Sequence, residues 1–425
     1  MIEIKPNLNF TVNCPICKII LQNKKIIWQG PHVCSDALCD NCKRKFLCDL
    51  PVGQALLLGG ILDTSNQKFY GEQVAPNWFN KSLERIITSP INQEISFKVE
   101  KKNEANEIII LNVLDTHYGH CLVRLLCLED LIKQYPEKKF IIITPVFLTW
   151  MIPNHPNIAE IWIVKMKMTD FNDYYPDLNL KIQNELERFK KIELAQVLNP
   201  KTPADISWFT GIETYNFQQE KPRITFIWRE DLNRLWIKNW FFYEVLKKLG
   251  IQKWFLRFHF NRVVAFIKKL KAELNNNSNR PSLITDKPIN QSPINQLPTT
   301  DFRFTVAGLG KSFKFPDFIE DWRVEQFDDA GEIKTCKIYA ESVVSIGIHG
   351  SSLILPSAFS GMLVCIMPSY RWGNISEDIL FKTNNARTES FDRRIVSIQM
   401  SLKELAFMCA DMIVWRSYFQ KKFLK

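Results

Sequence analysis

Short apolar runs alternate with amphipathic segments of helical length from residue 107 onward. Apolar runs of this length are typical of strands that are covered on both faces. Three of them are predicted as strands, at 108–114, 140–144 and 158–164. The spacing of the apolar residues further predicts a helix over 119–134 and a long charged helix over 178–198. Together these elements predict a first α/β domain over residues 51–220.

The same alternation starts again at residue 223 and predicts a second α/β domain over residues 221–400. Its predicted strands are 223–228, 254–258, 302–307, 343–348 and 362–367. Its predicted helices are 236–249, 260–274 and 332–341. Residues 275–300 interrupt the pattern, because they are rich in Asn, Pro and Ser and nearly lack apolar positions. That composition indicates a disordered or looping insertion.

Alternating strands and helices with short connections favour parallel sheets. The predicted fold class is therefore α/β, with two Rossmann-like doubly wound domains that face a cleft. The last segment, 401–425, has the pattern of an amphipathic helix with a lysine-rich end. We expect this helix to pack against the other lobe, and attachment to a membrane surface is the alternative.

The first fifty residues contain two Cys-x-x-Cys pairs separated by 21 residues. Two such pairs can place four thiolates tetrahedrally around a zinc ion, so residues 1–50 are predicted to form a small zinc-ribbon-like segment with a structural zinc site. The predicted ligands are Cys14, Cys17, Cys39 and Cys42. Three further residues offer alternative ligands, namely His32, Cys34 and Cys48.

Composition and charge narrow the class of protein. The chain has 11 cysteines in 425 residues, and those outside the first fifty are scattered through apolar segments, which favours reduced core thiols over a disulfide framework. The formal net charge is +10, but the basic residues are dispersed and form no stripe, so we expect no nucleic-acid partner. No apolar stretch approaches the length of a membrane span, and the start lacks the apolar core of a signal peptide. We therefore expect a cytoplasmic protein.

A polar loop ends the apolar run at 343–348. It consists of His349, Gly350, Ser351 and Ser352, and a helix and a further strand follow it. In open parallel sheets, ligands bind at the carboxyl ends of strands. A glycine there allows a ligand to approach the backbone, and hydroxyl groups and free amides can donate hydrogen bonds to an anion such as phosphate. The alternative is an ordinary turn between a strand and a helix.

Polar residues also follow the first strand of the amino-terminal half. Asp115, His117 and His120 come where that strand meets its helix. A histidine that titrates near neutral pH, or a carboxylate, can remove a proton from a hydroxyl group, so His120 and Asp115 are the predicted catalytic residues. The alternative is a helix cap formed by Asp115 or Thr116, with the imidazoles packed or at the surface.

Two further loops offer ligand-binding side chains. Arg229 and Arg234 follow the strand at 223–228 and can bind phosphate through forked hydrogen bonds, although pairing with Glu230 and Asp231 at the surface is the alternative. The loop after residue 367 contains Glu377, which can bind a sugar or ribose hydroxyl, or simply belong to a surface loop.

A segment at 308–312 resembles the end of a P-loop. The first glycine of that motif would fall at Thr305, inside a predicted strand, so an ATPase is not favoured.

Taken together, three loops resemble those of the family sixty-one glycosyltransferases and related enzymes of the GT-B fold. The similar features are the histidine, glycine and small residues at 349–352, the strand end at Arg229 that opens the second domain, and the Tyr-x-His of residues 118–120. The resemblance covers most of residues 107–400. The family pattern is His-Gly-Ala-Gly, whereas this chain has His-Gly-Ser-Ser.

The resemblance implies a transferase that moves a sugar from a nucleotide-sugar donor to a glycan, lipid-linked or protein acceptor. It assigns His349, Gly350, Ser351 and Arg229 to the donor diphosphate. In the amino-terminal motif, the acidic residue that often follows the histidine by four places is replaced by Arg124. The expected reaction inverts the anomeric centre, with retention as the alternative, and needs no catalytic metal.

Two rival functions stay open at this point. One is a non-enzymatic zinc-ribbon module on a degenerate α/β scaffold that binds protein or nucleic acid. The other is an α/β enzyme that acts on a different phosphorylated substrate, such as a nucleotide hydrolase or a phosphotransferase.

Overall fold

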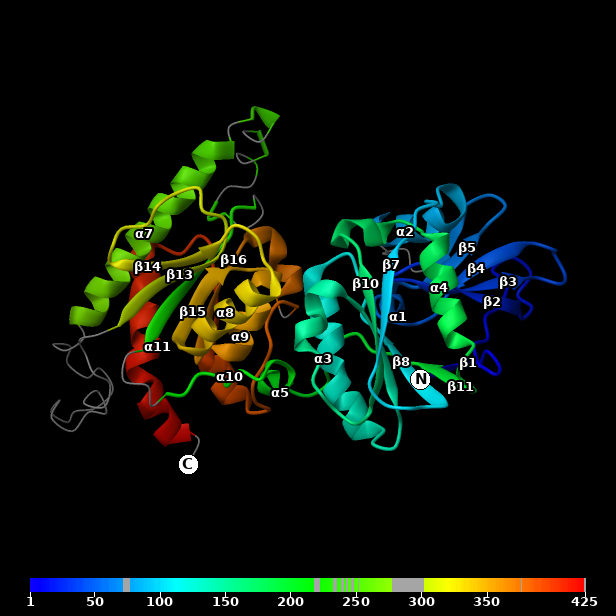
Figure 1. Cartoon of the computed structure of the whole chain (residues 1–425). Helices are drawn as coiled ribbons and strands as arrows, with labels where there is room; N and C mark the ends of the chain where they lie inside the picture. The colour runs from blue at the N-terminus through cyan, green and yellow to red at the C-terminus, as the bar shows by residue number, and fades with distance from the viewer. Residues whose placement is uncertain are drawn as a thin grey trace. The chain divides into compact units, whose positions relative to one another are not determined.

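The chain forms a mixed α/β protein with three sheets (Figure 1). A computed structural model describes residues 1–71, 77–217, 222–231, 235–237, 241, 244–245, 248–250, 252–276, 302–375 and 377–423. The chain divides into two compact units, Met1–Ala204 and Asp205–Lys425. The sequence prediction placed the corresponding boundary at 220/221 and a further one at 50/51.

The first unit contains a six-stranded sheet in the order β1-β11-β8-β9-β10-β7. Its four inner strands are parallel, and the two edge strands, β1 and β7, are antiparallel to their neighbours. In sheet order the strands are Ile2–Lys5, Lys191–Leu194, Glu107–Asn112, Phe140–Pro145, Ile158–Lys165 and Ser96–Lys101. The three central strands β8, β9 and β10 are buried at nearly every position, as in sheets that are covered on both faces, whereas β11 alternates partly buried polar residues with buried apolar ones.

A second, five-stranded antiparallel sheet precedes most of that sheet in the chain. It runs in the order β2-β3-β4-β5-β6, with strands Gln22–Trp28, Val33–Leu38, Lys45–Asp49, Gly60–Asp63 and Phe69–Gly71. It therefore extends beyond the predicted segment 1–50. The helices of the first unit are α1 (Ala55–Leu58), α2 (Asn77–Thr88), α3 (Tyr118–Gln134) and α4 (Pro176–Leu186), with 3-10 turns η1 (Val146–Met151) and η2 (Met168–Asn172).

The second unit is built on a six-stranded sheet in which every pairing is parallel. The strand order is β14-β13-β12-β15-β16-β17. The chain adds β13 and β14 on one side of β12 and then adds β15, β16 and β17 on the other side, so the order reverses between β12 and β15. The strands in chain order from β12 to β17 are Arg223–Trp228, Arg303–Leu309, Ile319–Val324, Ser342–Ile348, Met362–Met367 and Arg393–Ser397.

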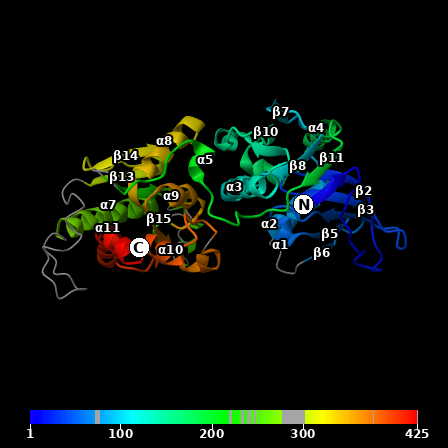
Figure 2. The same ribbon diagram turned by 90° about the horizontal axis from the view of Figure 1, so that it is seen from below.

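Helices cover both faces of this parallel sheet (Figure 2). Alternate strand residues such as Phe226, Ile346 and Val364 lie in one core with residues of two long helices, α7 and α11. Toward the opposite face, Gly347 packs against Leu353. The helical segments that lie within the described residues of the unit are α5 (Ile206–Thr210), α7 (Gln252–Asn276), α8 (Asp329–Ala340), η7 (Ser351–Leu353), α9 (Ile354–Phe359), η8 (Ser369–Asn374), α10 (Ala386–Asp392) and α11 (Leu402–Phe423).

Most of the predicted strands are confirmed, but two predicted elements are wrong. The long helix predicted over 178–198 ends at Leu186, and residues 191–194 form β11 instead. This segment is a strand because it fills the place between β1 and β8, where its backbone pairs on both sides. The strand predicted over 254–258 and the helix predicted over 260–274 are one continuous helix, α7. Aromatic residues favour strands, but packing against the sheet decides the conformation here.

Parts of some predictions lie outside the described residues. These parts are most of the insertion at 275–300, several positions of the helix at 236–249, and Arg234. Among the described residues, no helix is long and apolar enough to cross a membrane.

Candidate functional site

The two Cys-x-x-Cys pairs lie in two turns with the same backbone hydrogen bonding. In the first turn the amide of Lys18 donates to the carbonyl of Cys14 over 3.0 Å, and in the second the amide of Lys43 donates to the carbonyl of Cys39 over 2.9 Å. Lys18 and Lys43 have positive φ angles of 63° and 58°. The second turn connects β3 to β4, so the sheet itself holds this pair in place.

The four sulfur atoms of these turns form one cluster, in which all lie within 4.8 Å of one another. The Sγ atoms of Cys14 and Cys42 are 3.7 Å apart, and those of Cys17 and Cys39 are 3.3 Å apart. The hydrogen bond with Cys39 is the largest influence on Cys17 and lowers the pKa of its thiol to about 6. Since the thiolate is the metal-binding form, these four thiols can hold a metal ion such as zinc.

The three alternative ligands lie outside this cluster. The ring Nδ1 of His32 contacts Oδ2 of Asp49 at 2.7 Å, and the thiol of Cys34 lies 3.7 Å from the other oxygen of that carboxylate. Cys48 is buried in β4. A closed set of four thiolates leaves no position for a substrate, so the chemistry of the cluster fits a structural metal.

Asp115 is the centre of a second polar cluster, just beyond the carboxyl end of β8. Its Oδ1 accepts hydrogen bonds from Nδ1 of His120 at 3.0 Å and from the amide of His117 at 3.2 Å. Its Oδ2 accepts from Nη2 of Arg124 at 2.6 Å. Burial raises the pKa of this carboxyl, but the hydrogen bonds from His117 and His120 and the charge of Arg124 outweigh burial and hold the pKa well below its usual value. Asp115 is therefore an ionised carboxylate in a buried position.

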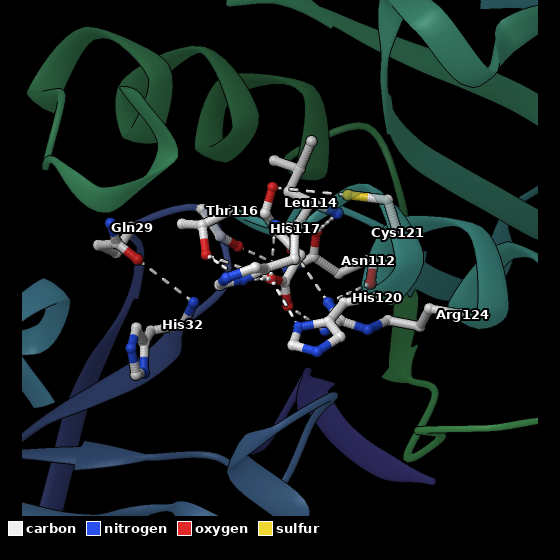
Figure 3. A network of polar contacts seen from close by, with 11 residues as sticks. Gln29, His32, Asn112, Leu114, Thr116, His117, His120, Cys121 and Arg124 are labelled. Atoms are coloured by element: carbon white, nitrogen blue, oxygen red, sulfur yellow. Dashed lines mark hydrogen bonds and ion pairs between the residues drawn. The ribbon is translucent and has the colours of Figure 1, made fainter. Parts of the chain in front are cut away.

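His120 lies in the first turn of α3, and Asp115 fixes its orientation (Figure 3). Because Nδ1 donates its proton to the carboxylate, the lone pair of the neutral ring lies on Nε2. The side chain is partly exposed. A buried carboxylate that orients a partly exposed imidazole is an arrangement suited to accepting a proton. His117 is more exposed, and its Nδ1 lies 2.9 Å from the hydroxyl of Thr116.

The same three residues can also be considered as a metal site. One ligand atom each from Asp115, His117 and His120 lies within 4.8 Å of the others. However, both oxygens of Asp115 already accept hydrogen bonds, and the guanidinium of Arg124 places a positive charge against one of them. This arrangement favours a hydrogen-bonded pair for proton transfer over a cation site.

Sequence reasoning missed the role of Arg124, which is fully buried on α3. Its Nη2 donates to Asp115, and its Nη1 donates to the carbonyls of Leu114 at 3.0 Å and Asn112 at 3.3 Å (Figure 3). It therefore ties α3 to the end of β8 and neutralises the buried carboxylate. The available signal was a single charge in the otherwise apolar run 121–128, since a buried charge needs a partner.

In the second unit, His349 lies at the carboxyl end of β15 and is completely buried. Its Nε2 donates to the carbonyl of Asn374 at 3.0 Å, and its Nδ1 lies 3.5 Å from Oδ2 of Asp378. Both partners belong to the segment after β16. His349 therefore holds two neighbouring loops together at the carboxyl edge of the sheet.

The backbone turns sharply at the next residue. Gly350 has φ 148° and ψ 171°, a conformation that is essentially restricted to glycine. Ser351 and Ser352 follow it in η7 and are partly exposed. Neither of their hydroxyls makes a hydrogen bond within the part of the chain that the structure describes, so both are available to a ligand.

Two further predicted ligand-binding residues, Arg229 and Glu377, have surface or loop positions. Arg229 pairs with Asp231 over 2.7 Å, which is the surface ion pair that the sequence left as the alternative. Glu377 is exposed and accepts a hydrogen bond from Nδ2 of Asn374 at 2.6 Å.

Glu230 has a role that the sequence did not suggest. Its carboxylate accepts hydrogen bonds from the amide and the hydroxyl of Ser312, at 2.9 and 2.5 Å, and from Nε1 of Trp228, at 3.1 Å. It thereby joins the end of β12 to the glycine-rich segment after β13. Thr305 lies inside β13, which confirms that this segment is not a P-loop.

No protein-family model, no curated protein and no solved structure was found to match this chain. What the geometry shows directly is a mixed α/β protein with a four-cysteine cluster that can hold a metal ion.

Proposed function

We propose that this chain is a glycosyltransferase that moves a sugar from a nucleotide-sugar donor to an acceptor hydroxyl. The strand order of the second unit supports this proposal. Numbered along the chain, its all-parallel sheet has the order 3-2-1-4-5-6, which is the order of Rossmann-type nucleotide-binding sheets. In such sheets the ligand binds at the carboxyl ends of the two strands where the order reverses, which are β12 and β15 here.

The single observation that carries the proposal is the conformation at Gly350. This residue follows β15 directly, and its backbone conformation is one that other residues adopt only with strain. Glycine adopts this conformation without strain, and the absence of a side chain lets a ligand approach the backbone. The hydroxyls of Ser351 and Ser352 come next, where they can donate hydrogen bonds to a diphosphate.

The remaining groups of the loop would support the donor site. His349 is buried, so we assign it the positioning of the loop and not direct contact with the donor. Arg229 would contact the diphosphate only after its ion pair with Asp231 breaks.

The four-cysteine cluster is proposed to hold a structural zinc ion, which stabilises the antiparallel sheet of the first unit.

The proposed chemistry is a direct displacement. The acceptor oxygen forms a bond to the anomeric carbon of the sugar, while the bond from that carbon to the phosphate oxygen breaks and its electron pair leaves with the nucleoside diphosphate. The acceptor proton passes to Nε2 of His120, and Asp115 stabilises the imidazolium that results. A single displacement inverts the anomeric centre.

The first test is a thermal-shift screen of the purified protein with UDP, GDP, CMP, TDP and their sugars. A ligand that binds only the folded state raises the melting temperature. We expect one nucleotide to stabilise the wild type, and Ser351→Ala combined with Ser352→Ala to reduce that shift. These substitutions remove hydroxyls that have no hydrogen-bond partner among the described residues, so the melting temperature without ligand should change little. Ser89→Ala, an exposed serine of the first unit, is the matched control.

The second test separates sugar transfer from other phosphate chemistry. The stabilising nucleotide-sugar is incubated with the protein and a panel of glycan and lipid-linked acceptors, and the products are identified by mass spectrometry. A glycosylated acceptor supports the proposal. Release of a nucleotide at the same rate without any acceptor would indicate a hydrolase or phosphotransferase. If no nucleotide stabilises the protein at millimolar concentration, the donor site is wrong and the zinc-ribbon interaction module becomes the better hypothesis.

A further inference from the structure

A pair of aromatic side chains is exposed near the amino-terminal end of α7. Trp254 has 54% of its surface exposed and Phe258 has 42%. Their rings stack on one another, with centroids 6.0 Å apart and an angle of 14° between the planes. Figure 1 shows α7 running beside α11 and extending past the strands at this end. Contiguous exposed apolar groups of this kind often mark protein or membrane interaction sites.

The exposed stripe of α7 continues from these aromatic residues into basic residues. The helix buries one face in the core of the second unit, through Phe266, Leu270 and their neighbours. On the opposite face, positions spaced three, four and seven residues apart form a single stripe. This stripe consists of Trp254, Arg257, Phe258, Asn261, Ala265, Lys268 and Lys269, all exposed except the partly buried Ala265. We call it the α7 stripe.

The segment that leads into α7 has the same character. Phe241 is 79% exposed and Leu249 is 65% exposed, and Val245 is also exposed. Residues 241–276 contain only two acidic side chains, Glu244 and Glu273. They contain eight basic side chains, at 247, 248, 253, 257, 262, 268, 269 and 271. This segment therefore contributes much of the net charge of +10.

We propose that the α7 stripe binds the surface of an anionic lipid bilayer. Tryptophan and phenylalanine enter the region between lipid headgroups and acyl chains, and lysine and arginine beside them attract anionic headgroups. A basic surface that recognised only an acidic protein or a nucleic-acid duplex would not require the exposed stacked pair of Trp254 and Phe258. This inference is independent of the proposed enzymatic function.

The surface assigned here differs from the one that the sequence suggested. The sequence pattern made the terminal amphipathic helix the alternative site of membrane attachment. In the structure the apolar residues of α11 lie in the core of the second unit, including Leu405, Cys409 and Met412. Among the described side chains of α11 the aromatic residue Phe407 is exposed, whereas α7 exposes the stacked pair of Trp254 and Phe258.

The test is sedimentation with vesicles of phosphatidylcholine, with and without phosphatidylglycerol. We expect the full-length wild type to bind the anionic vesicles at low salt, to bind pure phosphatidylcholine at least tenfold more weakly, and to dissociate as salt is added. Two variants test the two ends of the stripe. Trp254→Ser with Phe258→Ser removes the aromatic pair, and Lys268→Glu with Lys269→Glu reverses the charge. Each should reduce the partition coefficient at least tenfold.

Matched controls keep the test specific. Phe327→Ser removes an exposed aromatic residue elsewhere, and Lys24→Glu with Lys25→Glu makes the same change of charge in the first unit. Both controls should bind vesicles like the wild type. The lysine variant alters exposed residues only, so it tests the proposal even if the aromatic variant unfolds. The proposal is overturned if the wild type does not bind anionic vesicles or if the variants bind them as well as the controls do. It is also overturned if the α7 stripe binds a polyanion such as RNA and does not bind vesicles.

Discussion

Gly53 and Arg124 are packed so closely that no side chain fits between them. A β-carbon at Gly53 would lie 2.6 Å from Cζ of Arg124, and the glycine also has a positive φ of 57°. Gly53 follows β4 of the antiparallel sheet, whereas Arg124 belongs to α3. The buried guanidinium that holds Asp115 is therefore positioned partly by a backbone segment 71 residues away in the chain.

We predict that Gly53→Ala destabilises the protein more than the matched variant Gly211→Ala. Gly211 has a similar φ of 67°, but a β-carbon added there would have no atom of the described residues within 4 Å. Gly211→Ala should cost about 1–2 kcal/mol for the backbone conformation alone. Gly53→Ala should cost roughly 1–3 kcal/mol more, because Arg124 must move. Urea unfolding measures both values, and equal losses would show that the contact with Arg124 is unimportant.

A pH dependence is predicted for the buried pair of His32 and Asp49. Burial lowers the pKa of His32, but Asp49 and the carbonyl of Phe79 outweigh burial, so the pKa is raised. Both ring nitrogens face acceptors, at 2.7 Å and 3.1 Å. The stabilisation of the folded protein by the charged His32 beside Asp49 is then complete below the unfolded-state pKa of about 6.5. It is lost as the pH rises through the higher folded-state pKa of His32.

The measurement is the free energy of unfolding between pH 5 and pH 9 for the wild type and for His32→Asn. The advantage of the wild type should shrink as the pH rises above neutrality. Parallel profiles for the wild type and His32→Asn would rule out a charged His32.

Metal content is predicted to depend on the four clustered cysteines and not on their neighbours. The wild type should contain about one zinc ion per chain, as a four-thiolate site does. Cys39→Ser should lose this zinc on dialysis against a chelator, and the first unit should melt at a lower temperature. Cys48→Ser is the control, because Cys48 is buried nearby but lies outside the cluster. Elemental analysis by mass spectrometry measures the zinc content of the wild type and the two variants. Equal zinc in all three proteins would contradict the assignment of Cys39 as a zinc ligand.

The two histidines near Asp115 should differ in their effect on sugar transfer. His120→Ala removes the proposed base and should lower kcat roughly 10²- to 10⁴-fold. His117→Ala should lower it less than about tenfold, because its ring is more exposed and Asp115 is hydrogen-bonded by its backbone amide. Initial rates with a saturating donor and acceptor provide the comparison. Equal losses of kcat in the two variants would show that His120 is not the base.

The sequence predicted those elements whose burial is uniform. The run at 343–348 is buried at every position in β15, so its continuous apolar pattern identified it as a strand. Burial that depends on distant partners was harder to predict. Residues 191–194 are a strand because β1 and β8 lie on either side of them, and nothing local distinguishes them from the end of a charged helix.

The candidate site was predictable to a similar extent. Asp115 and His120 are five residues apart across one junction of strand and helix, so their proximity follows from local structure. The contact of Arg124 with Gly53 and the contact of His349 with Asn374 join different parts of the chain. Such contacts arise only when the sheets have assembled, and a single sequence contains no direct signal for them.

The pairing of β1 with β11 has a consequence for folding during protein synthesis. Ile2 lies opposite Leu194, and β1 occupies an edge of the six-stranded sheet beside β11. The ribosome makes β1 before β11, and this partner strand emerges almost 200 residues later. At 5–20 residues per second the delay is roughly 10–40 s. Throughout that interval β1 lacks its partner strand β11. We therefore expect chaperone binding to the growing chain to concentrate at β1.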